Sequence, residues 1–255
     1  MNNNGDKNHL ISYVRQQIID KKKFRNDKKK YISLCEDDEI FVYLKENEFP
    51  LLSEYRTDAA NLDAHYFLQD IWFAKRIIKN KPIVHYDIGS RVDGFLSHLL
   101  SADINVNMID IRPLGIELEG LSFTQGDATD LKNIKSDSIH SLSSLHVVEH
   151  FGLGRYGDPI DPDGWKKGLL AMQRIVEPGG YFYLGVPISN KNTLCFNAHR
   201  KFEYHEVTKV LDKMKLIETA YISNYSVINV PIDKFEKTNI SDDYACGLYV
   251  FNKDL

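Results

Sequence analysis

Three aspartates stand at or near the ends of three successive apolar segments, and their placement suits a nucleoside. Asp87 closes the segment 82–89, Asp110 follows 23 residues later, and Asp127 closes the segment 121–128. Ligands of open α/β sheets bind outside the carboxyl ends of the strands. A carboxylate at the second end can accept hydrogen bonds from both ribose hydroxyls, and one at the third end can accept from an adenine amino group. The three acids together predict a nucleoside site.

The turn after the first aspartate limits the kind of nucleotide. Gly89 and Gly94 match the outer positions of G-x-G-x-x-G, but Arg91 holds the middle one. A side chain there hinders the close approach of a pyrophosphate. This disfavours an NAD-linked oxidoreductase, which stays the alternative enzyme class. The Arg91 guanidinium either binds a carboxylate of the ligand or pairs with Asp93 or Asp87 inside the fold.

Histidine and glutamate follow the fourth apolar segment and could move a proton. His146, Glu149 and His150 lie in the sequence LHVVEH, and His199 is a second candidate base further along the chain. A hydroxyl nucleophile benefits from such a base. The alternative is that Glu149 and His150 cap a helix or brace the loop. The same residues with nearby aspartates resemble an oxygen-rich cation site, but we predict no metal.

A polar loop, residues 152–165, is long for a simple connector and predicts a lid over a bound substrate. The alternative is a rigid turn whose aspartates cap the next helix. His65, Tyr66, Gln69 and Asp70 form a polar edge on a helix that precedes the first strand, and the alternative is an ordinary helix surface with capping residues. The predicted substrate-binding residues are His65, Tyr66, Arg155, Tyr156, Asp158 and Arg200. Arg200 is the predicted anchor for a phosphate or carboxylate of the substrate.

The elements that carry these residues alternate along the chain. Strands are expected at 82–89, 104–111, 121–128, 138–148, 181–189, 216–223 and 244–253, and helices at 65–80, 95–100, 164–176 and 203–214. This alternation predicts a Rossmann-like α/β fold with a seven-stranded, mostly parallel sheet. The last two strands are expected as an antiparallel pair at its edge. We place the domain at 61–255, after a basic helical extension at 1–60.

Composition narrows the class of protein. The 255 residues are 43% hydrophobic, and the net charge of −4 gives no indication of nucleic-acid binding. No apolar stretch is long enough to span a membrane, and the first residues lack the apolar core of a secretory signal. Three scattered cysteines (Cys35, Cys195 and Cys246) form no metal or redox motif. A cytoplasmic protein is expected.

The segment 15–30 differs from this average. It carries eight lysines or arginines against two aspartates. The simplest interpretation is a solvated helix face. The alternative is a peripheral contact with an anionic membrane or an acidic carrier.

Residues 63–253 resemble class I S-adenosylmethionine-dependent methyltransferases. The matching motifs are HYDIGSRVDGF, MIDIRP, QGDATDL, SSLHVVEHFG and VEPGGYFYLGVP. More narrowly, SLHVVEHFGLGRYGDPIDPDGW and CFNAHRKF resemble a domain-of-unknown-function family from nematodes and bacterial surface-polysaccharide gene clusters. Arg91 and Asp93 replace glycines that are usual in the cofactor loop. The resemblance implies these S-adenosylmethionine contacts: Asp87, Gly89, Ser90, Arg91, Asp110, Ile111, Asp127, Ala128, Leu145 and His146.

The resemblance also implies an activity. It suggests O-methylation of a small polar acceptor, such as a sugar, a nucleotide sugar or a phosphate-bearing precursor of a surface polysaccharide. The alternative outside catalysis is a methyltransferase-like binding module in a polysaccharide assembly complex. The oligomeric state stays open.

Overall fold

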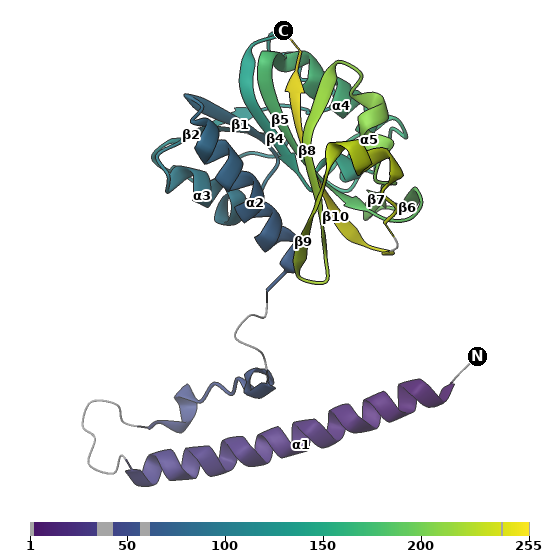
Figure 1. Cartoon of the computed structure of the whole chain (residues 1–255). Coiled ribbons are helices and arrows are strands. Elements are labelled where there is room, and N and C mark those ends of the chain that lie inside the picture. The colour runs from purple at the N-terminus through teal and green to yellow at the C-terminus, as the bar shows by residue number, and fades with distance from the viewer. Residues whose placement is uncertain (1–2, 35–42, 57–61, 241, 255) are drawn as a thin grey trace. The chain divides into compact units, whose positions relative to one another are not determined.

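The computed structural model describes residues 3–34, 43–56, 62–240 and 242–254, with side chains from residue 12 onward. The chain divides into two compact units, Met1–Leu62 and Asp63–Leu255. The first contains the long helix α1 (Asn3–Leu34) and two short 3₁₀ helices, Lys45–Asn47 and Leu52–Arg56 (Figure 1). Within the described residues, no helix combines the length and the apolar character needed to cross a bilayer.

The second unit is built on one eight-stranded sheet in the order β3-β2-β1-β4-β5-β10-β8-β9 (Figure 1). The five strands from β3 to β5 are parallel, and the remaining pairs are antiparallel. The strands are β1 (Val84–Ile88), β2 (Asn105–Asp110), β3 (Leu121–Gln125), β4 (Ile139–Leu145), β5 (Val176–Ile188), β8 (Met214–Ser223), β9 (Ser226–Val230) and β10 (Ala245–Lys253). The predicted Rossmann-like, mostly parallel fold is confirmed.

The antiparallel end of the sheet differs in detail from the prediction. Strand β9 is an eighth strand, and β10 lies between β5 and β8 instead of at the edge. Strand β9 follows β8 through a tight turn at Asn224 and Tyr225, both with positive φ. Such hairpin turns usually contain glycine, so this turn gave no clear sequence signal.

Two further predictions shift in the structure. The expected turn at 177–180 lies inside β5, where a bulge places these four residues opposite His140 of β4: Ile139 pairs with Val176 and Ser141 with Tyr181. The helix expected at 203–214 is shortened to α5 (Glu206–Val210). The chain leaves α5 at Leu211, because β8 begins at Met214.

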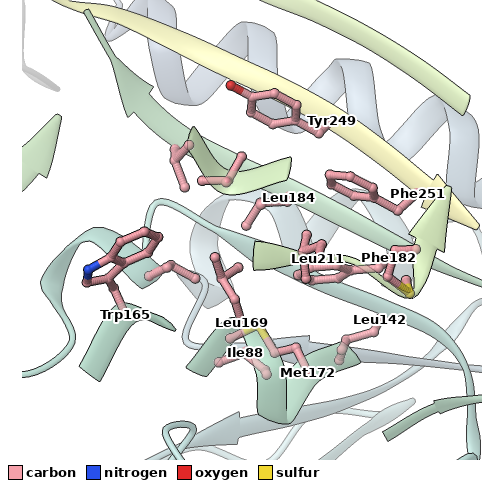
Figure 2. Close-up of a cluster of buried hydrophobic side chains, with 14 of the residues drawn as sticks. Ile88, Leu142, Trp165, Leu169, Met172, Phe182, Leu184, Leu211, Tyr249 and Phe251 are labelled. Carbon is pink, nitrogen blue, oxygen red and sulfur yellow. The ribbon is translucent and has the colours of Figure 1, made fainter. Parts of the chain in front are cut away.

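Helices cover both faces of the sheet and fix the strand ends. On one face, Leu169 and Met172 of α4 (Gly164–Ile175) pack against Phe182 and Leu184 of β5 (Figure 2). The intervening Tyr183 points to the opposite face, as the two-residue period of a strand requires. There it meets the second core cluster, which α2 (Ala64–Asn80) and α3 (Ser97–Leu100) supply. Each fully buried large side chain contributes about 1.5–3 kcal/mol.

Candidate functional site

Two adjoining cavities lie at the carboxyl ends of the parallel strands. The first cavity reaches the ends of β1, β2 and β3, and the second extends from β1 and β4 toward α2. Both are lined by Gly89, Arg112, His146, His150 and Tyr156, so they form one continuous site.

Most predicted site residues line these cavities. The first cavity contains Gly89, Asp110, Ile111, Asp127, Ala128, His146, His150, Tyr156 and Asp158. The second contains Tyr66, Gly89, Ser90, Arg91, Leu145, His146, Glu149, His150, Arg155, Tyr156 and His199. Their grouping follows from strand order, because residues far apart in the chain end at the same edge of the sheet.

Asp87, His65 and Arg200 do not line either cavity. The His65 ring stacks at 5.1 Å against the ring of Tyr244, which does line the second cavity. The Arg200 guanidinium donates to the carbonyl oxygens of Phe151, at 2.6 Å, and Pro162, at 3.3 Å. Arg200 therefore braces the loop after β4, and it lines a separate pocket together with residues of that loop.

Asp87 shapes the turn after β1 from inside the fold. Its carboxylate is fully buried and accepts hydrogen bonds from the Ser90 backbone N–H, at 3.0 Å, the Ser90 hydroxyl and the Ser143 hydroxyl. Burial raises the pKa of Asp87 to about 6, although these hydrogen bonds oppose the shift. The carboxylate thus holds Gly89 and Ser90 in place for the cavity.

This raised pKa predicts an unusual pH dependence for an asparagine at position 87. Between pH 3.8 and about 6 the unfolded chain loses the Asp87 proton before the folded chain does, so this group lowers stability as the pH rises. The shift corresponds to about 3 kcal/mol. We therefore compare the free energy of unfolding of Asp87→Asn with that of wild type, by urea unfolding at two pH values. The difference, variant minus wild type, should be more favourable to the variant at pH 7 than at pH 4 by about this amount.

Asp137→Asn is the matched control for this prediction. The Lys253 ammonium lowers the pKa of the Asp137 carboxyl. Its contribution therefore has the opposite sign, being lost as the pH falls. An Asp87→Asn profile parallel to that of Asp137→Asn would contradict the burial of a proton on Asp87.

Asp110 lies at the end of β2 and is held by Arg112. The arginine donates from its backbone N–H at 2.8 Å, from Nε at 3.0 Å and from Nη2 at 2.7 Å. Its guanidinium also lies 4.7 Å from the centre of the Tyr156 ring. Arg112 was not among the predicted site residues, although its position two residues after Asp110 is visible in the sequence.

Asp127 presents one oxygen to the first cavity. Its Oδ1 accepts from the Thr129 backbone N–H at 2.8 Å and from the Thr129 hydroxyl at 2.7 Å. Both hydrogen bonds use the same oxygen, so Oδ2 can accept a further donor. Ile111 and Ala128 supply apolar walls beside it.

The turn after β1 carries two opposite charges that line the second cavity. Arg91 donates from Nε and Nη2 to Asp93, at 3.0 and 2.8 Å, and both side chains are more than 70% exposed. An exposed pair of this kind is worth little and separates easily. Deeper in the same cavity, burial raises the pKa of Asp70 to about 6.

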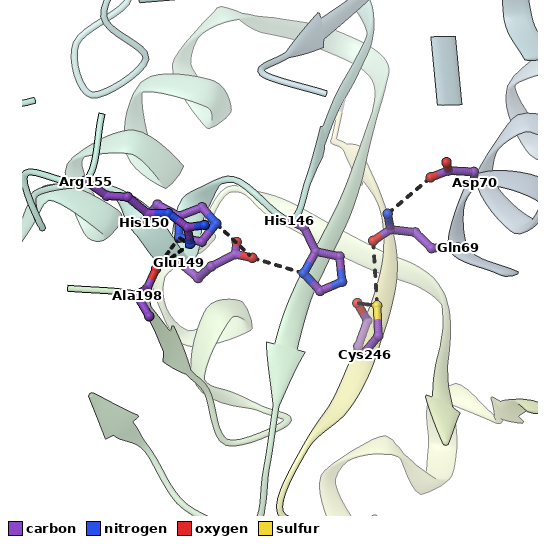
Figure 3. A network of polar contacts seen from close by, with 9 residues as sticks. Gln69, Asp70, His146, Glu149, His150, Arg155, Ala198 and Cys246 are labelled. Atoms are coloured by element: carbon purple, nitrogen blue, oxygen red, sulfur yellow. Dashed lines mark hydrogen bonds and ion pairs between the residues drawn. The ribbon is translucent and has the colours of Figure 1, made fainter. Parts of the chain in front are cut away.

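Glu149 links two histidines, and all three side chains line the second cavity (Figure 3). His146 Nδ1 donates to Glu149 Oε1 at 3.0 Å, and His150 Nε2 lies 3.7 Å from the same oxygen. The Glu149 side chain is 1% exposed, and within the described chain neither Glu149 Oε2 nor His146 Nε2 has a hydrogen-bond partner. Burial opposes a charge on His146, while Cys246 and Glu149 favour it more, so its pKa is raised.

His150 has a defined tautomer. Its Nδ1 lies 2.7 Å from the carbonyl oxygen of Ala198, which can only accept, so Nδ1 carries the proton. Nε2 then holds a free electron pair and lies 3.7 Å from Glu149 Oε1. Burial lowers the pKa of His150, so the neutral imidazole prevails at neutral pH. Arg155 donates to the same carbonyl at 2.9 Å and stabilises this arrangement.

His199 is carried by a small hairpin beside the site. The strands β6 (Thr193–Cys195) and β7 (His199–Lys201) place its ring 5.7 Å from the Tyr244 ring in the second cavity. Burial lowers the pKa of His199. The hairpin also supplies the Ala198 carbonyl, so it positions two histidines.

The loop after β4 folds around Asp158. This carboxylate accepts from the backbone N–H groups of Gly152, Gly154 and Tyr156, at 2.9, 3.2 and 3.1 Å. The loop thereby holds Tyr156 against His150, with ring centres 5.6 Å apart. The alternative of aspartates capping the next helix finds no support at Asp163, whose side chain makes no capping hydrogen bond to α4.

Gly152 is the tightest point of this loop and allows a stability prediction. Its φ is +74°, and an added Cβ would lie 1.9 Å from the carbonyl oxygen of Asp161. We expect Gly152→Ala to cost roughly 2 kcal/mol or more in urea unfolding, because the backbone must shift. Gly157→Ala is the control: its φ is +80° with open space around it, so only the backbone strain of about 1 kcal/mol applies. Equal losses would disprove the clash.

Arg112 and Tyr244 line the second cavity but were not predicted, whereas Gln69 and Asp70 line it as part of the polar helix edge expected from the sequence. Gln69 is fully buried and links Asp70, at 3.3 Å, to the Cys246 thiol, at 3.6 Å (Figure 3). Cys246 is 177 positions away in the chain, so spacing gives no sign of this second contact. Among the described residues, no group of three or more histidine, cysteine or acidic side chains is arranged to hold a metal ion.

Comparison with known proteins supports the fold. A family model described as "Caenorhabditis protein of unknown function, DUF268" matches residues 125–244. No curated protein matches the sequence. The 1,6-didemethyltoxoflavin-N1-methyltransferase of Burkholderia thailandensis, solved with S-adenosylhomocysteine, aligns with a TM-score of 0.52 at 14% identity, covering 75% of this chain and 84% of that one.

Two further solved chains align over similar lengths. The [4+2]-cyclase SpnF gives a TM-score of 0.53 at 11% identity, covering 74% of this chain and 81% of that one. A chain of the complex between the Trm112 methyltransferase activator of Haloferax volcanii and a methyltransferase gives 0.50 at 16%, covering 74% and 91%. The unit Asp63–Leu255 thus shares its Rossmann-like fold with methyltransferases, and also with a protein named as a cyclase.

Proposed function

We propose that the protein is an S-adenosylmethionine-dependent methyltransferase that modifies an oxygen of a small polar acceptor. The observation that carries this proposal is one continuous site with two chemically different ends. The first cavity offers Asp110 and Asp127 between apolar walls, and the second offers neutral His150 beside Glu149. A nucleoside fits the first end and a proton transfer fits the second.

The cofactor contacts follow from the donors and acceptors in place. Asp110 would accept from the ribose hydroxyls after Arg112 moves aside, and Asp127 Oδ2 from the adenine amino group. Arg91 would exchange Asp93 for the methionine carboxylate, because the two exposed side chains separate readily. Asp70, buried in the second cavity, would face the cationic amino group.

Asp87 then acts on the cofactor indirectly. The resemblance implies a direct contact, but its carboxylate is fully buried and bound to two serines. In this proposal it is a positioning residue for Gly89 and Ser90. Leu145, in contrast, lines the second cavity and provides an apolar surface beside His146.

The chain's own residues would supply alignment and a proton acceptor. The sulfonium provides an activated methyl group, so the protein must chiefly orient the acceptor and exclude water. His150 Nε2 would take the proton of the attacking hydroxyl, and the resulting imidazolium would be stabilised by Glu149, 3.7 Å away. His146, bound to the same carboxylate, would position Glu149. His199 is the second candidate for this proton transfer.

Arg155 supports an acceptor that carries an anionic group. Among the described residues, its guanidinium donates to the Ala198 carbonyl oxygen and has no acidic partner. Its remaining N–H groups can bind a phosphate or carboxylate beside His150. Arg200 was the residue predicted for this task, but its donors are engaged by carbonyls of the loop. A sugar phosphate or nucleotide sugar, such as a surface-polysaccharide precursor, has this chemistry.

Ligand binding tests the proposal directly. We expect S-adenosylhomocysteine to bind the full chain in isothermal titration calorimetry and to raise its melting temperature, while NADH at the same concentration does neither. Stabilisation by NADH in place of S-adenosylhomocysteine would favour the oxidoreductase. Release of S-adenosylhomocysteine from S-adenosylmethionine with a panel of sugar phosphates and nucleotide sugars would then identify the acceptor class.

A second candidate function is a binding module without catalysis. It is favoured by one observation: Arg112 occupies both oxygens of Asp110 in the structure. If that contact is permanent, the ribose has no acceptor. Absence of S-adenosylhomocysteine binding at millimolar concentration, in a chain that is shown to be folded, would decide for the module.

A further inference from the structure

Helix α1 presents two chemically different faces, and segment 43–56 contacts only one of them. On this inner face, Asp20 pairs with Arg56, and Lys28 Nζ lies 2.8 Å from Glu48. These contacts anchor the helix within the first unit and define which side of it is turned inward.

The two acidic residues of the segment 15–30 both belong to the inner face. Asp27 pairs with Lys23 at 2.6 Å and accepts from the Tyr55 hydroxyl at 3.4 Å, close to the side where Asp20 meets Arg56. At about 100° per residue, Asp20 and Asp27 lie within about 20° of each other around the axis. The negative charge of this segment is therefore confined to one side and is already compensated.

The opposite side, the outer face, carries positive charge without acid. At about 100° per residue, its members fall within an arc of about 120° that faces away from Asp20 and Asp27. They are Val14, Arg15, Ile18, Lys21, Lys22, Arg25, Lys29 and Ile32. The five basic side chains are exposed, and among the described residues none has an acidic partner.

Apolar side chains lie among these charges. Val14 is 49%, Ile18 62% and Ile32 38% exposed. Lysine and arginine stems are themselves apolar and let the charged head reach outward. The outer face thus combines charge for an anionic surface with side chains that can enter an apolar layer.

We propose that the outer face of α1 binds the surface of an anionic lipid bilayer. Charge complementarity argues for an anionic partner, and the three interspersed aliphatic side chains favour the boundary between headgroups and acyl chains. A second copy of the helix is disfavoured, because five like charges would face five. Nucleic acid would use the charges but leave the aliphatic side chains in water. This inference is independent of the reaction at the other unit.

The test is co-sedimentation of the full chain with vesicles. At low salt, wild type is expected to bind vesicles of phosphatidylcholine that contain about 30 mol% phosphatidylserine. It should bind vesicles of pure phosphatidylcholine at least about tenfold more weakly. Each basic residue near such a surface is worth about fivefold. The triple variant Lys22→Gln, Arg25→Gln, Lys29→Gln should therefore bind roughly 100-fold more weakly.

Two controls make the result specific. Lys75→Gln, Lys135→Gln, Lys234→Gln removes the same charge from exposed positions of the second unit and should bind like wild type. Ile18→Ser keeps all charges and should weaken vesicle binding roughly fivefold, since an aliphatic contact is lost. Circular dichroism checks that α1 remains helical in each variant.

Three outcomes would overturn the proposal. Equal binding to neutral and anionic vesicles would show that electrostatic attraction does not drive the binding. Binding of the triple variant at the wild-type level would show that the outer face is not the binding surface. Stronger binding to single-stranded RNA than to the vesicles, unchanged by Ile18→Ser, would assign the face to nucleic acid.

Discussion

Asp110→Ala is expected to abolish measurable binding of S-adenosylhomocysteine. In the proposed complex this carboxylate accepts two hydrogen bonds from the ribose, and charge-assisted hydrogen bonds are worth about 1.5–3 kcal/mol each. Their loss corresponds to a dissociation constant that is larger by roughly 100-fold to 10,000-fold, as measured by isothermal titration calorimetry. No other single substitution in the first cavity removes two such contacts at once.

Asp130→Ala is the matched control for this substitution. Asp130 is also an aspartate that follows a strand of the sheet, and it accepts from the Lys132 backbone N–H, but it lies outside both cavities. Its variant should bind like wild type. Binding by Asp110→Ala within about threefold of wild type would contradict the position of the ribose.

Arg112→Ala separates the two proposed functions further. If Arg112 covers Asp110 only until the cofactor enters, its removal frees the carboxylate and binding should be at least as tight as in wild type. The Tyr156 ring, which lies over the same guanidinium, would lose a cation–π contact in that variant. A large loss of affinity would indicate that Arg112 is itself part of the nucleoside site.

The sheet edge could be predicted from sequence because it depends on local signals. Asp110 and Asp127 follow short apolar segments, and parallel strands bring such ends together whatever lies between them. The eighth strand was missed, because Asn224 and Tyr225 form its turn without glycine. The local pattern was therefore enough to predict the acids that follow the strands, but not the turn between β8 and β9.

Partners distant in the chain account for the rest. Arg200 was predicted to bind an anion, but it donates to the carbonyl of Phe151, 49 positions away in the chain. Asp70 belongs to the polar helix edge expected from the sequence, but its burial in the second cavity and its pKa of about 6 could not be predicted. Sequence shows the charge of a side chain, whereas its burial and its partners depend on the packed structure.

His150→Ala is expected to leave S-adenosylhomocysteine binding within about threefold of wild type and to lower kcat by roughly 100-fold to 10,000-fold. The physical reason is the fixed tautomer: with Nδ1 bound to the Ala198 carbonyl, Nε2 is the atom able to take a proton. The measurement is S-adenosylhomocysteine release at saturating S-adenosylmethionine, with the acceptor found in the panel described above. Glu149→Gln should lower kcat less, because it removes only the stabilisation of the imidazolium.

The pH profile distinguishes a proton acceptor from a residue that merely shapes the cavity. Burial lowers the pKa of His150 below its ordinary value of 6.5, so wild-type kcat should stay level at neutral pH and fall only at more acidic pH. That acid limb should disappear from the residual activity of His150→Ala, and it should persist in His199→Ala if His199 only lines the cavity. If the limb survives in His150→Ala and vanishes in His199→Ala, the proton acceptor is His199. In that case the hydrogen bond from His150 Nδ1 to the Ala198 carbonyl would only hold His150 in place. His199, the next residue of the same hairpin, would be the base.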